Sequence, residues 1–127
     1  MKRIATLTAG LLLFAGSAQA HHSGAMFDRT KQVTVTGTVK EFNWTNPHAS
    51  FAVEVMKPDG SAELWGVEMN SPNNLVREGW TRTTIMPGDK VSALINPLRD
   101  GKPGGVYVGI TLPSGKYIGA AAAKSTY

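Results

Sequence analysis

The chain has 127 residues, no cysteine, 13 lysines and arginines, 9 aspartates and glutamates, and a formal net charge of +4 at pH 7. Without cysteine it has no disulfide, thiolate zinc site, redox dithiol or cysteine nucleophile. The length suits one compact domain and not two. Because no run of basic residues occurs, the charge pattern predicts that nucleic acid is not a partner.

The N-terminal segment is typical of a secretory signal. Lys2 and Arg3 give a positively charged start, and residues 4–15 are almost entirely apolar. This apolar stretch is shorter than the roughly 20 residues that a membrane-spanning helix needs. We therefore expect an exported protein, periplasmic or secreted, with no membrane span after processing.

The cleavage site decides which residue becomes the new N-terminus. Ala18 and Ala20 put small side chains at both positions that a signal peptidase recognises, which predicts a mature chain beginning at His21. Cleavage after Ala18 is the alternative, and it would make His21 the third mature residue. Removal of residues 1–20 leaves 11 basic and 9 acidic residues, so the mature chain is close to neutral.

Five short segments beyond the signal are predicted to be strands. Each is rich in β-branched or alternating apolar residues and is bounded by turn residues. They comprise residues 32–42, 50–56, 62–69, 90–96 and 106–112. Gly37, inside the first, predicts a bulge or a sharp bend at a barrel corner. Gly104 and Gly105 are assigned only to the turn before the last strand.

One short helix is predicted between the third and fourth strands. Ser71 can cap it, Pro72 suits the first helical position, and Gly79 can end it in a left-handed conformation. We expect Leu75 and Val76 to be buried beneath this helix.

The order of the elements indicates the fold class. Three strands, a helix and two more strands match an all-β, five-stranded OB-like barrel with a helix that plugs one end. A small two-sheet β-sandwich is the alternative. The expected organisation is a cleaved signal, an N-terminal arm, the barrel and a flexible tail, at residues 1–20, 21–31, 32–118 and 119–127.

Several short motifs occur together along the mature chain. They are His21-His22-Ser23, Met26-Phe27-Asp28, Gly37 to Phe42, Trp44 to His48, Glu68-Met69, Ser71-Pro72-Asn73, Gly79-Trp80, Pro87-Gly88-Asp89 and Pro97 to Gly101. In this combination the sequence resembles a family of small exported bacterial proteins known only as a domain of unknown function. The resemblance implies a shared fold and compartment, and it implies no particular activity.

The three histidines are candidate metal ligands. At a new N-terminus, His21 can chelate through its α-amine and its ring Nδ1, and a second imidazole completes a planar set of nitrogens that favours Cu(II). His48, in the loop after the first strand, is the preferred partner. His22 is auxiliary, because adjacent side chains diverge in an extended chain. The sequence thus predicts copper as a bound ion.

Two alternatives to this folded copper site remain open. Cleavage after Ala18 would allow a flexible N-terminal site made of the amine, backbone amides and the His21 ring. The histidines could also bind no metal, with His48 only fixing the Asn46–Pro47 turn by a hydrogen bond.

Softer and harder donors could complete a copper site. The thioethers of Met26 and Met69 suit Cu(I), although a single Met more often fills a core. Glu68 and Asp28 are weaker candidates for an axial oxygen, and Asp28 is more simply explained as a brace for the N-terminal arm.

The tryptophans and the absence of catalytic motifs narrow the possible functions. Trp44, Trp65 and Trp80 could stack on a sugar or peptide, or Trp65 could fill the core while the other two cover the barrel ends. The sequence contains no nucleophile elbow and no phosphate loop, so we expect no enzyme, with an oxidative copper enzyme left open. The hypotheses are an exported copper carrier or sensor, and a metal-free OB-fold module that binds an envelope protein or glycan.

Overall fold

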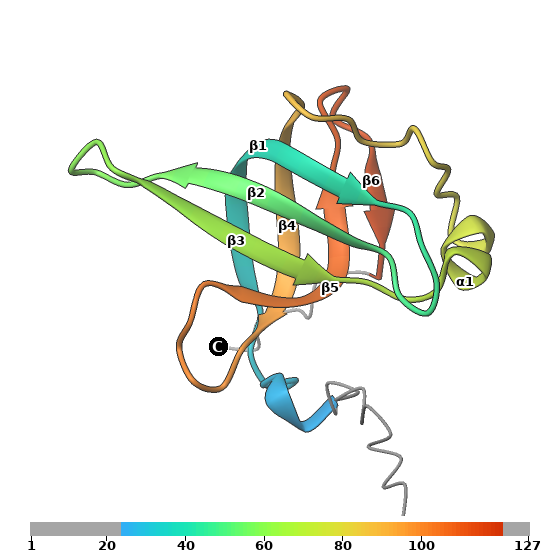
Figure 1. Cartoon of the computed structure of the whole chain (residues 1–127), viewed down its shortest axis with the longest axis horizontal. Helices are drawn as coiled ribbons and strands as arrows, with labels where there is room; N and C mark the ends of the chain where they lie inside the picture. Colours follow the sequence, from blue (N-terminus) through green and yellow to red (C-terminus); the bar gives the residue numbers. More distant parts are fainter. Residues whose placement is uncertain (1–23, 121–127) are drawn as a thin grey trace, which may run out of the picture.

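A computed structural model describes residues 24–120 (Figure 1). The predicted signal, His21 and His22 lie outside this range. The six strands are β1 (Val33–Asn43), β2 (Ser50–Met56), β3 (Ala62–Glu68), β4 (Lys90–Pro97), β5 (Gly104–Thr111) and β6 (Tyr117–Gly119). Helix α1 (Pro72–Arg77) lies between β3 and β4, and a 3-10 turn (Gly24–Met26) precedes β1. No helix in residues 24–120 is long and apolar enough to span a membrane.

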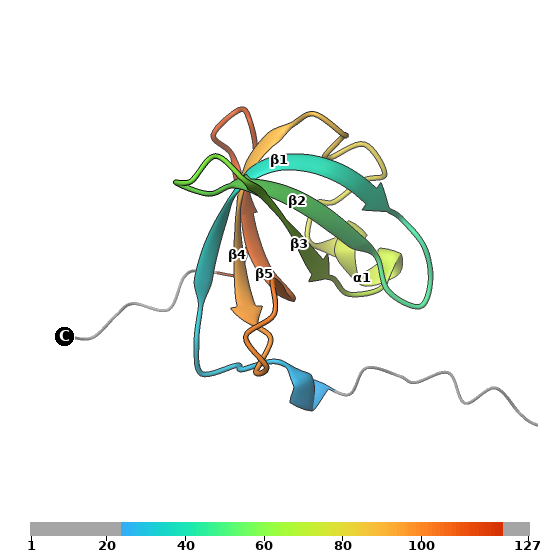
Figure 2. The same cartoon turned by 60° about the vertical axis from the view of Figure 1, so that its left-hand side comes forward.

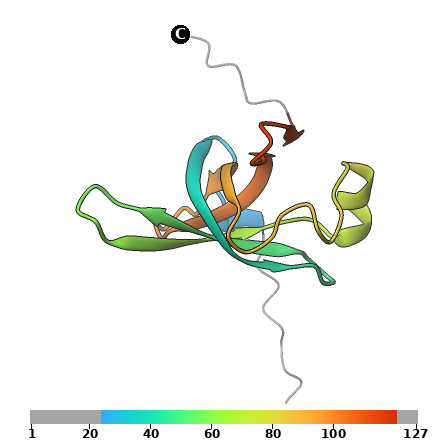
Figure 3. The same cartoon turned by 90° about the horizontal axis from the view of Figure 1, so that it is seen from above.

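The strands form one closed barrel. Antiparallel pairing runs in the order β3-β2-β1-β4-β5, and a parallel contact between β3 and β5 closes the ring. Figure 2 shows β1, β2 and β3 arching over β4 and β5, and Figure 3 shows the β2–β3 hairpin and α1 on opposite sides of the barrel. The predicted OB-like fold is confirmed, and the β-sandwich alternative does not apply. Strand β6 was not predicted; it adds to the free edge of β5.

Strand β1 turns the corner of the barrel at Gly37. Its first half pairs with β4 and its second half with β2, and the change of partner occurs at Thr38. A side-chain carbon on Gly37 would overlap the carbonyl oxygen of Glu54, so only glycine permits this close approach. The predicted bend is confirmed, while the register shift that marks a bulge lies further on, between Val39 and Glu41.

Glycines also allow β3 and β5 to meet. Gly66 lies opposite Gly104 in the parallel register, and a Cβ on Gly104 would come within 3.0 Å of the Gly66 carbonyl oxygen. A Cβ on Gly105 would overlap the carbonyl oxygen of Asn96. Gly104 and Gly105 therefore begin β5 and close the barrel, so their assignment to a turn alone was wrong.

Helix α1 forms between β3 and β4, as predicted, and its Leu75 side chain joins the core of the barrel. Ser71 caps its first turn, and Gly79, at φ +97°, ends it. The N–H groups of Gly79 and Trp80 donate to the carbonyls of Val76 and Leu75, the pattern of a Schellman motif. Leu75 is fully buried, but Val76 is 59% exposed, so the prediction for Val76 was wrong. Successive helical residues point about 100° apart, and so short a helix buries one face only.

The core fills the barrel and reaches under the helix. Trp80 is its largest side chain, stacked edge-on against Tyr107 at 5.4 Å between ring centroids and tilted against Phe42 at 5.9 Å. Trp65 is only half-buried, with its Nε1–H donating to Glu63, so its assignment to the core was wrong. The other core residues are Val35, Val39, Ala49, Phe51, Val53, Val67, Met69, Leu75, Ile85, Val91, Ala93, Ile95, Ile110 and Ile118.

Candidate functional site

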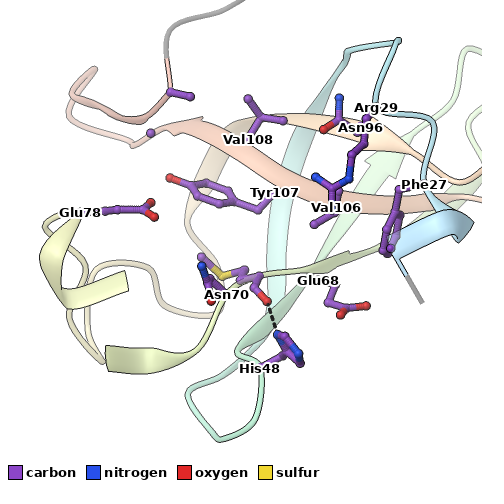
Figure 4. A pocket seen from close by; sticks show the side chains of 14 residues that line it. Phe27, Arg29, His48, Glu68, Asn70, Glu78, Asn96, Val106, Tyr107 and Val108 are labelled. Carbon is purple, nitrogen blue, oxygen red and sulfur yellow. Dashed lines mark hydrogen bonds between the residues drawn. The ribbon is translucent and has the colours of Figure 1, made fainter. Parts of the chain in front are cut away.

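A groove of about 830 Å³ opens beside the closing contact between β3 and β5 (Figure 4). Its walls come from the end of β3, the β1–β2 loop, β5 and the N-terminal arm. Two predicted metal ligands, His48 and Met69, are among its lining residues. The others are Gly24, Phe27, Arg29, Glu68, Asn70, Glu78, Asn96, Val106, Tyr107, Val108, Gly119 and Ala120.

The N-terminal arm is attached to the barrel at one side of this groove. Phe27 is buried and forms an isolated β-bridge with Leu98, in the loop between β4 and β5. The backbone N–H of Arg99 donates to the carbonyl of Met26 at 2.9 Å. These contacts place Gly24, the first residue that the structure describes, in the wall of the groove.

Asp28 braces the arm and does not line the groove. Its Oδ1 accepts from the backbone N–H and the hydroxyl of Thr30, at 3.1 Å and 2.5 Å, and its Oδ2 lies 3.5 Å from Lys31 Nζ. The hydrogen bonds from Thr30, helped by the charges of Arg99 and Lys31, hold the pKa of Asp28 below its ordinary value. The structure supports the predicted bracing role for this carboxylate.

His48 is held by one hydrogen bond across to the neighbouring strand. Its ring Nδ1 lies 3.0 Å from the carbonyl oxygen of Met69 (dashed in Figure 4). Since a carbonyl only accepts, Nδ1–H donates, and in the neutral ring the lone pair lies on Nε2. No described residue bonds to Nε2. Metal-binding histidines are commonly oriented in this way, by a backbone carbonyl on the other ring nitrogen.

An irregularity in the β2–β3 ladder makes that carbonyl available. The N–H of Ala49 donates to the carbonyl of Asn70 at 3.0 Å and not to that of Met69. The N–H of Met69 donates to the carbonyl of Ala49 at 2.9 Å. The Met69 carbonyl is thereby left for the His48 ring. The bond therefore ties His48 to the end of β3 and does not fix the Asn46–Pro47 turn.

The two methionines occupy different environments. Met69 is 2% exposed and its side chain belongs to the core, so its contribution to the groove is the carbonyl that orients His48. Met26 is 38% exposed and lines another groove, of about 480 Å³, together with Phe27 and Leu98. The structure does not bring Met26 together with His48.

The opposite wall of the groove contains a fixed tyrosine that the sequence did not single out. The Tyr107 hydroxyl accepts from Trp80 Nε1 at 3.1 Å and donates to the carbonyl of Ile118 at 3.0 Å. Burial raises the pKa of Tyr107 to about 12, so this side chain is neutral at physiological pH. Tyr107 forms a rigid, uncharged wall.

The described residues alone do not form a complete metal site. Residues 24–120 contain no group of three or more histidines, cysteines, aspartates or glutamates that could hold an ion. They provide one oriented imidazole, His48, and one carboxylate nearby, Glu68. The predicted ligands His21 and His22 are outside the described range.

The sequence matches the model of a protein family described as a family of unknown function (DUF6152) over residues 9–107. The chain belongs to this family. The matched range includes all of the motifs that the resemblance rested on. No curated protein matches the sequence.

Among solved structures, the barrel is similar to a mitochondrial single-stranded DNA binding protein from S. cerevisiae, Rim1. In one crystal structure of Rim1 the TM-score is 0.50 at 12% identity, covering 65% of this chain and 92% of that one. In a second, the TM-score is 0.46 at 18% identity, covering 65% and 93%. At these identities the likeness concerns the fold, an OB-like barrel of the kind that binds ligands on its surface.

The prediction that nucleic acid is not a partner has to be corrected. A structural neighbour of this barrel, Rim1, is a single-stranded DNA binding protein, which contradicts an exclusion based on charge pattern. Barrels of this kind bind single strands through charged grooves and stacking aromatic residues that are distant in sequence. The absence of a basic run is therefore uninformative for this fold.

Proposed function

We propose that this chain is an exported copper-binding protein, a carrier or sensor, that holds Cu(II) between the mature N-terminus and His48. The observation that carries the proposal is the hydrogen bond from His48 Nδ1 to the Met69 carbonyl, which leaves Nε2 available in the groove. In this proposal the protein is periplasmic or secreted and serves to bind the ion and not to catalyse a reaction.

The attachment of the arm supports the proposed partner of His48. Gly24 lines the same groove as His48, and His21 precedes Gly24 by three residues. An extended chain gains roughly 3.3–3.6 Å per residue, so the three residues from Gly24 back to His21 can span at most about 11 Å. The α-amine and Nδ1 of His21, with Nε2 of His48, would supply three nitrogens, a donor set that suits Cu(II). His22 is proposed as an auxiliary ligand.

The position of the methionines favours the oxidised ion. Met69 is committed to the core and Met26 lines another groove, so neither thioether adds a soft ligand beside His48. Nitrogen and oxygen donors suit Cu(II) better than Cu(I).

The proposal is tested on protein processed in the periplasm. Its intact mass should begin at His21; retention of Gln19 and Ala20 would favour the flexible-site alternative. Copper affinity is then compared with that of a variant carrying one extra residue before His21, which removes the chelate and leaves the fold unchanged. The dissociation constant should rise by at least about 100-fold, which is about 2.7 kcal/mol. Equal affinities would show that the N-terminus is not the site.

The second hypothesis is a metal-free module for an envelope protein or glycan, and the size of the groove is the observation that favours it. Its volume of about 830 Å³ falls within the range of pockets for small organic ligands and exceeds the room one ion needs. The tryptophans give it no support, since Trp80 is 1% exposed and neither Trp44 nor Trp65 lines the groove. A processed protein that shows no d–d absorption band with Cu(II) would favour this second function.

A further inference from the structure

We propose that a groove on the outer face of β1, β2 and β3 docks an extended segment of a partner protein, one that carries a lysine or arginine on either side of an apolar residue. The groove has a volume of about 480 Å³. We name it the Gly66 groove after a residue of its floor, and the groove that contains His48 the His48 groove. His48 does not line the Gly66 groove, so the inference goes beyond the copper site and does not depend on it.

The floor of the Gly66 groove lies on the side of the sheet that faces away from the core (Figure 1). Side chains alternate between the two faces along a strand, and Phe51, Val53 and Val67 are buried in the core. Ala52 and Gly66 pair with each other across β2 and β3 and therefore face outward. Both line the groove, and because both are small they leave room above the sheet for side chains of a partner.

Within the described structure, Gly66 has no conformational or packing reason to be glycine. Its φ is not positive, and a Cβ built on it would meet no atom within 4 Å. The glycines of the other strands differ, because a Cβ would come within 3.0 Å of another atom at Gly37, Gly104, Gly105, Gly109 and Gly119. A glycine inside a strand weakens the strand, and it often marks a place where a ligand or another chain approaches closely. The apolar side chain of the partner packs against Gly66.

The apolar wall of the groove is fixed before any partner binds. Met26, Phe27 and Leu98 line it, and Phe27 forms a β-bridge with Leu98. The N–H of Asp28 donates to the carbonyl of Pro97 at 2.8 Å, which holds the N-terminal arm against the barrel. A wall that is already in place needs little ordering on association, and this favours affinity. The exposed thioether of Met26 can adapt to the shape of an apolar partner.

The charged groups of the groove are all acidic. Glu41 and Glu68 line it on either side of β2, and no lysine, arginine or histidine is among its described lining residues. Neither carboxylate forms a salt bridge with a described residue; Glu41 accepts one hydrogen bond, from Asn43 at 2.7 Å. The groove therefore favours a basic partner and repels an acidic one.

The spacing of the two carboxylates indicates the size of the partner. Neighbouring strands lie about 4.8 Å apart, so the backbones that carry Glu41 and Glu68 are separated by roughly 10 Å. A single ion cannot contact both side chains while it also covers the apolar floor between them. An extended peptide with a basic residue on either side of an apolar one has the required pattern. Exposed ion pairs contribute little, so the floor and wall supply most of the affinity and the carboxylates select the charge.

The first test uses the processed protein, without added metal, and a synthetic pentapeptide of alternating lysine and leucine with blocked ends. Titration followed by nuclear magnetic resonance should give saturable shifts centred on the amide signals of Ala52, Gly66 and Glu68. A peptide with serine in place of leucine should bind at least about tenfold more weakly, because its apolar burial is lost. A peptide with glutamate in place of lysine should show no saturable binding.

The second test changes the groove and keeps the lysine–leucine peptide. Gly66→Val fills the floor, and it should raise the dissociation constant by about tenfold or more without lowering the melting temperature, since β-branched residues suit strands. Glu41→Gln should raise the dissociation constant about two- to fivefold. Two controls lie on the same face outside the groove and should bind as the native protein does: Leu64→Ala on β3 and Glu54→Gln on β2.

Each opposite result would overturn the inference. Native affinity in Gly66→Val would show that the groove is not the site, and equal weakening in Leu64→Ala would show general adhesion to exposed apolar surface. Equal binding of the lysine and glutamate peptides, or shifts confined to the His48 groove, would refute the proposed partner and its place. Glu41→Gln adds no bulk, so native affinity in that variant decides against the inference even if Gly66→Val does not fold.

Discussion

The end of the barrel under α1 and the His48 groove beside β3 differ in how completely their side chains are buried and bonded within the protein. Under α1, Leu75 and Trp80 are at most 1% exposed, and the Trp80 indole N–H is bonded to Tyr107. In the groove, the Glu68 and Glu78 carboxylates have no partner among the described residues, and His48 uses one ring nitrogen only. The buried polar groups under α1 are bonded within the protein, whereas these three side chains of the groove are at least partly exposed and are open to a ligand.

The largest expected effect tests the helix plug. Leu75→Ala should lower the free energy of unfolding by about 2–5 kcal/mol, because it opens a cavity beneath α1 where the side chain is fully buried. Val76→Ala, on the exposed face of the same helix, should change it by no more than about 0.5 kcal/mol. Urea denaturation measures both. A loss of less than about 0.5 kcal/mol in Leu75→Ala would show that α1 does not plug the barrel.

The second prediction concerns Tyr107, which belongs to both regions. Tyr107→Phe leaves the Trp80 N–H and the Ile118 carbonyl without their partner, so it should cost about 1–3 kcal/mol of unfolding free energy. Tyr117→Phe, at a more exposed hydroxyl, is the matched control and should cost less. Equal losses in the two variants would contradict a special role for Tyr107.

The same tyrosine predicts a loss of stability at alkaline pH. The pKa of Tyr107 is about 12 in the folded protein and about 10 when exposed, so the unfolded chain loses this proton first. The contribution of Tyr107 to stability should therefore be constant below pH 10, and stability should fall as the pH rises from 10 to 12. Denaturation across this range should show a shallower fall in Tyr107→Phe. An identical fall in both proteins would mean that other groups cause it.

The fold was largely predictable because its signals are local. Alternation marked the strands, and Ser71, Pro72 and Gly79 marked the ends of the helix. The predictions failed where the outcome depended on contacts distant in sequence. Gly104 and Gly105 look like turn residues until β3 lies against them, and β6 is only three residues long.

The candidate site was predictable only in part. The residue type and loop position of His48 identified it, but its orientation depends on an irregularity in the ladder that no pattern in the sequence shows. The burial of the tryptophans also depends on contacts that are distant in sequence. Trp80, three residues after α1, is buried in the core, whereas Trp65 on β3 is half-buried.

Apart from the control substitutions, the smallest expected effect on stability is at His48, and it separates a ligand from a structural residue. His48→Ala removes one hydrogen bond from an exposed side chain, and water can replace it on the Met69 carbonyl. Without metal, the free energy of unfolding should therefore fall by only about 0.5–1.5 kcal/mol. With Cu(II) at about 100 times its dissociation constant, the native protein should gain about 2.7 kcal/mol, and most of this gain should be absent in the variant. Denaturation curves with and without Cu(II) give both quantities. If the variant loses several kcal/mol without copper, His48 belongs to the structural framework. If it gains as much from copper as the native protein does, the ion is bound without the barrel, on the N-terminal chelate alone.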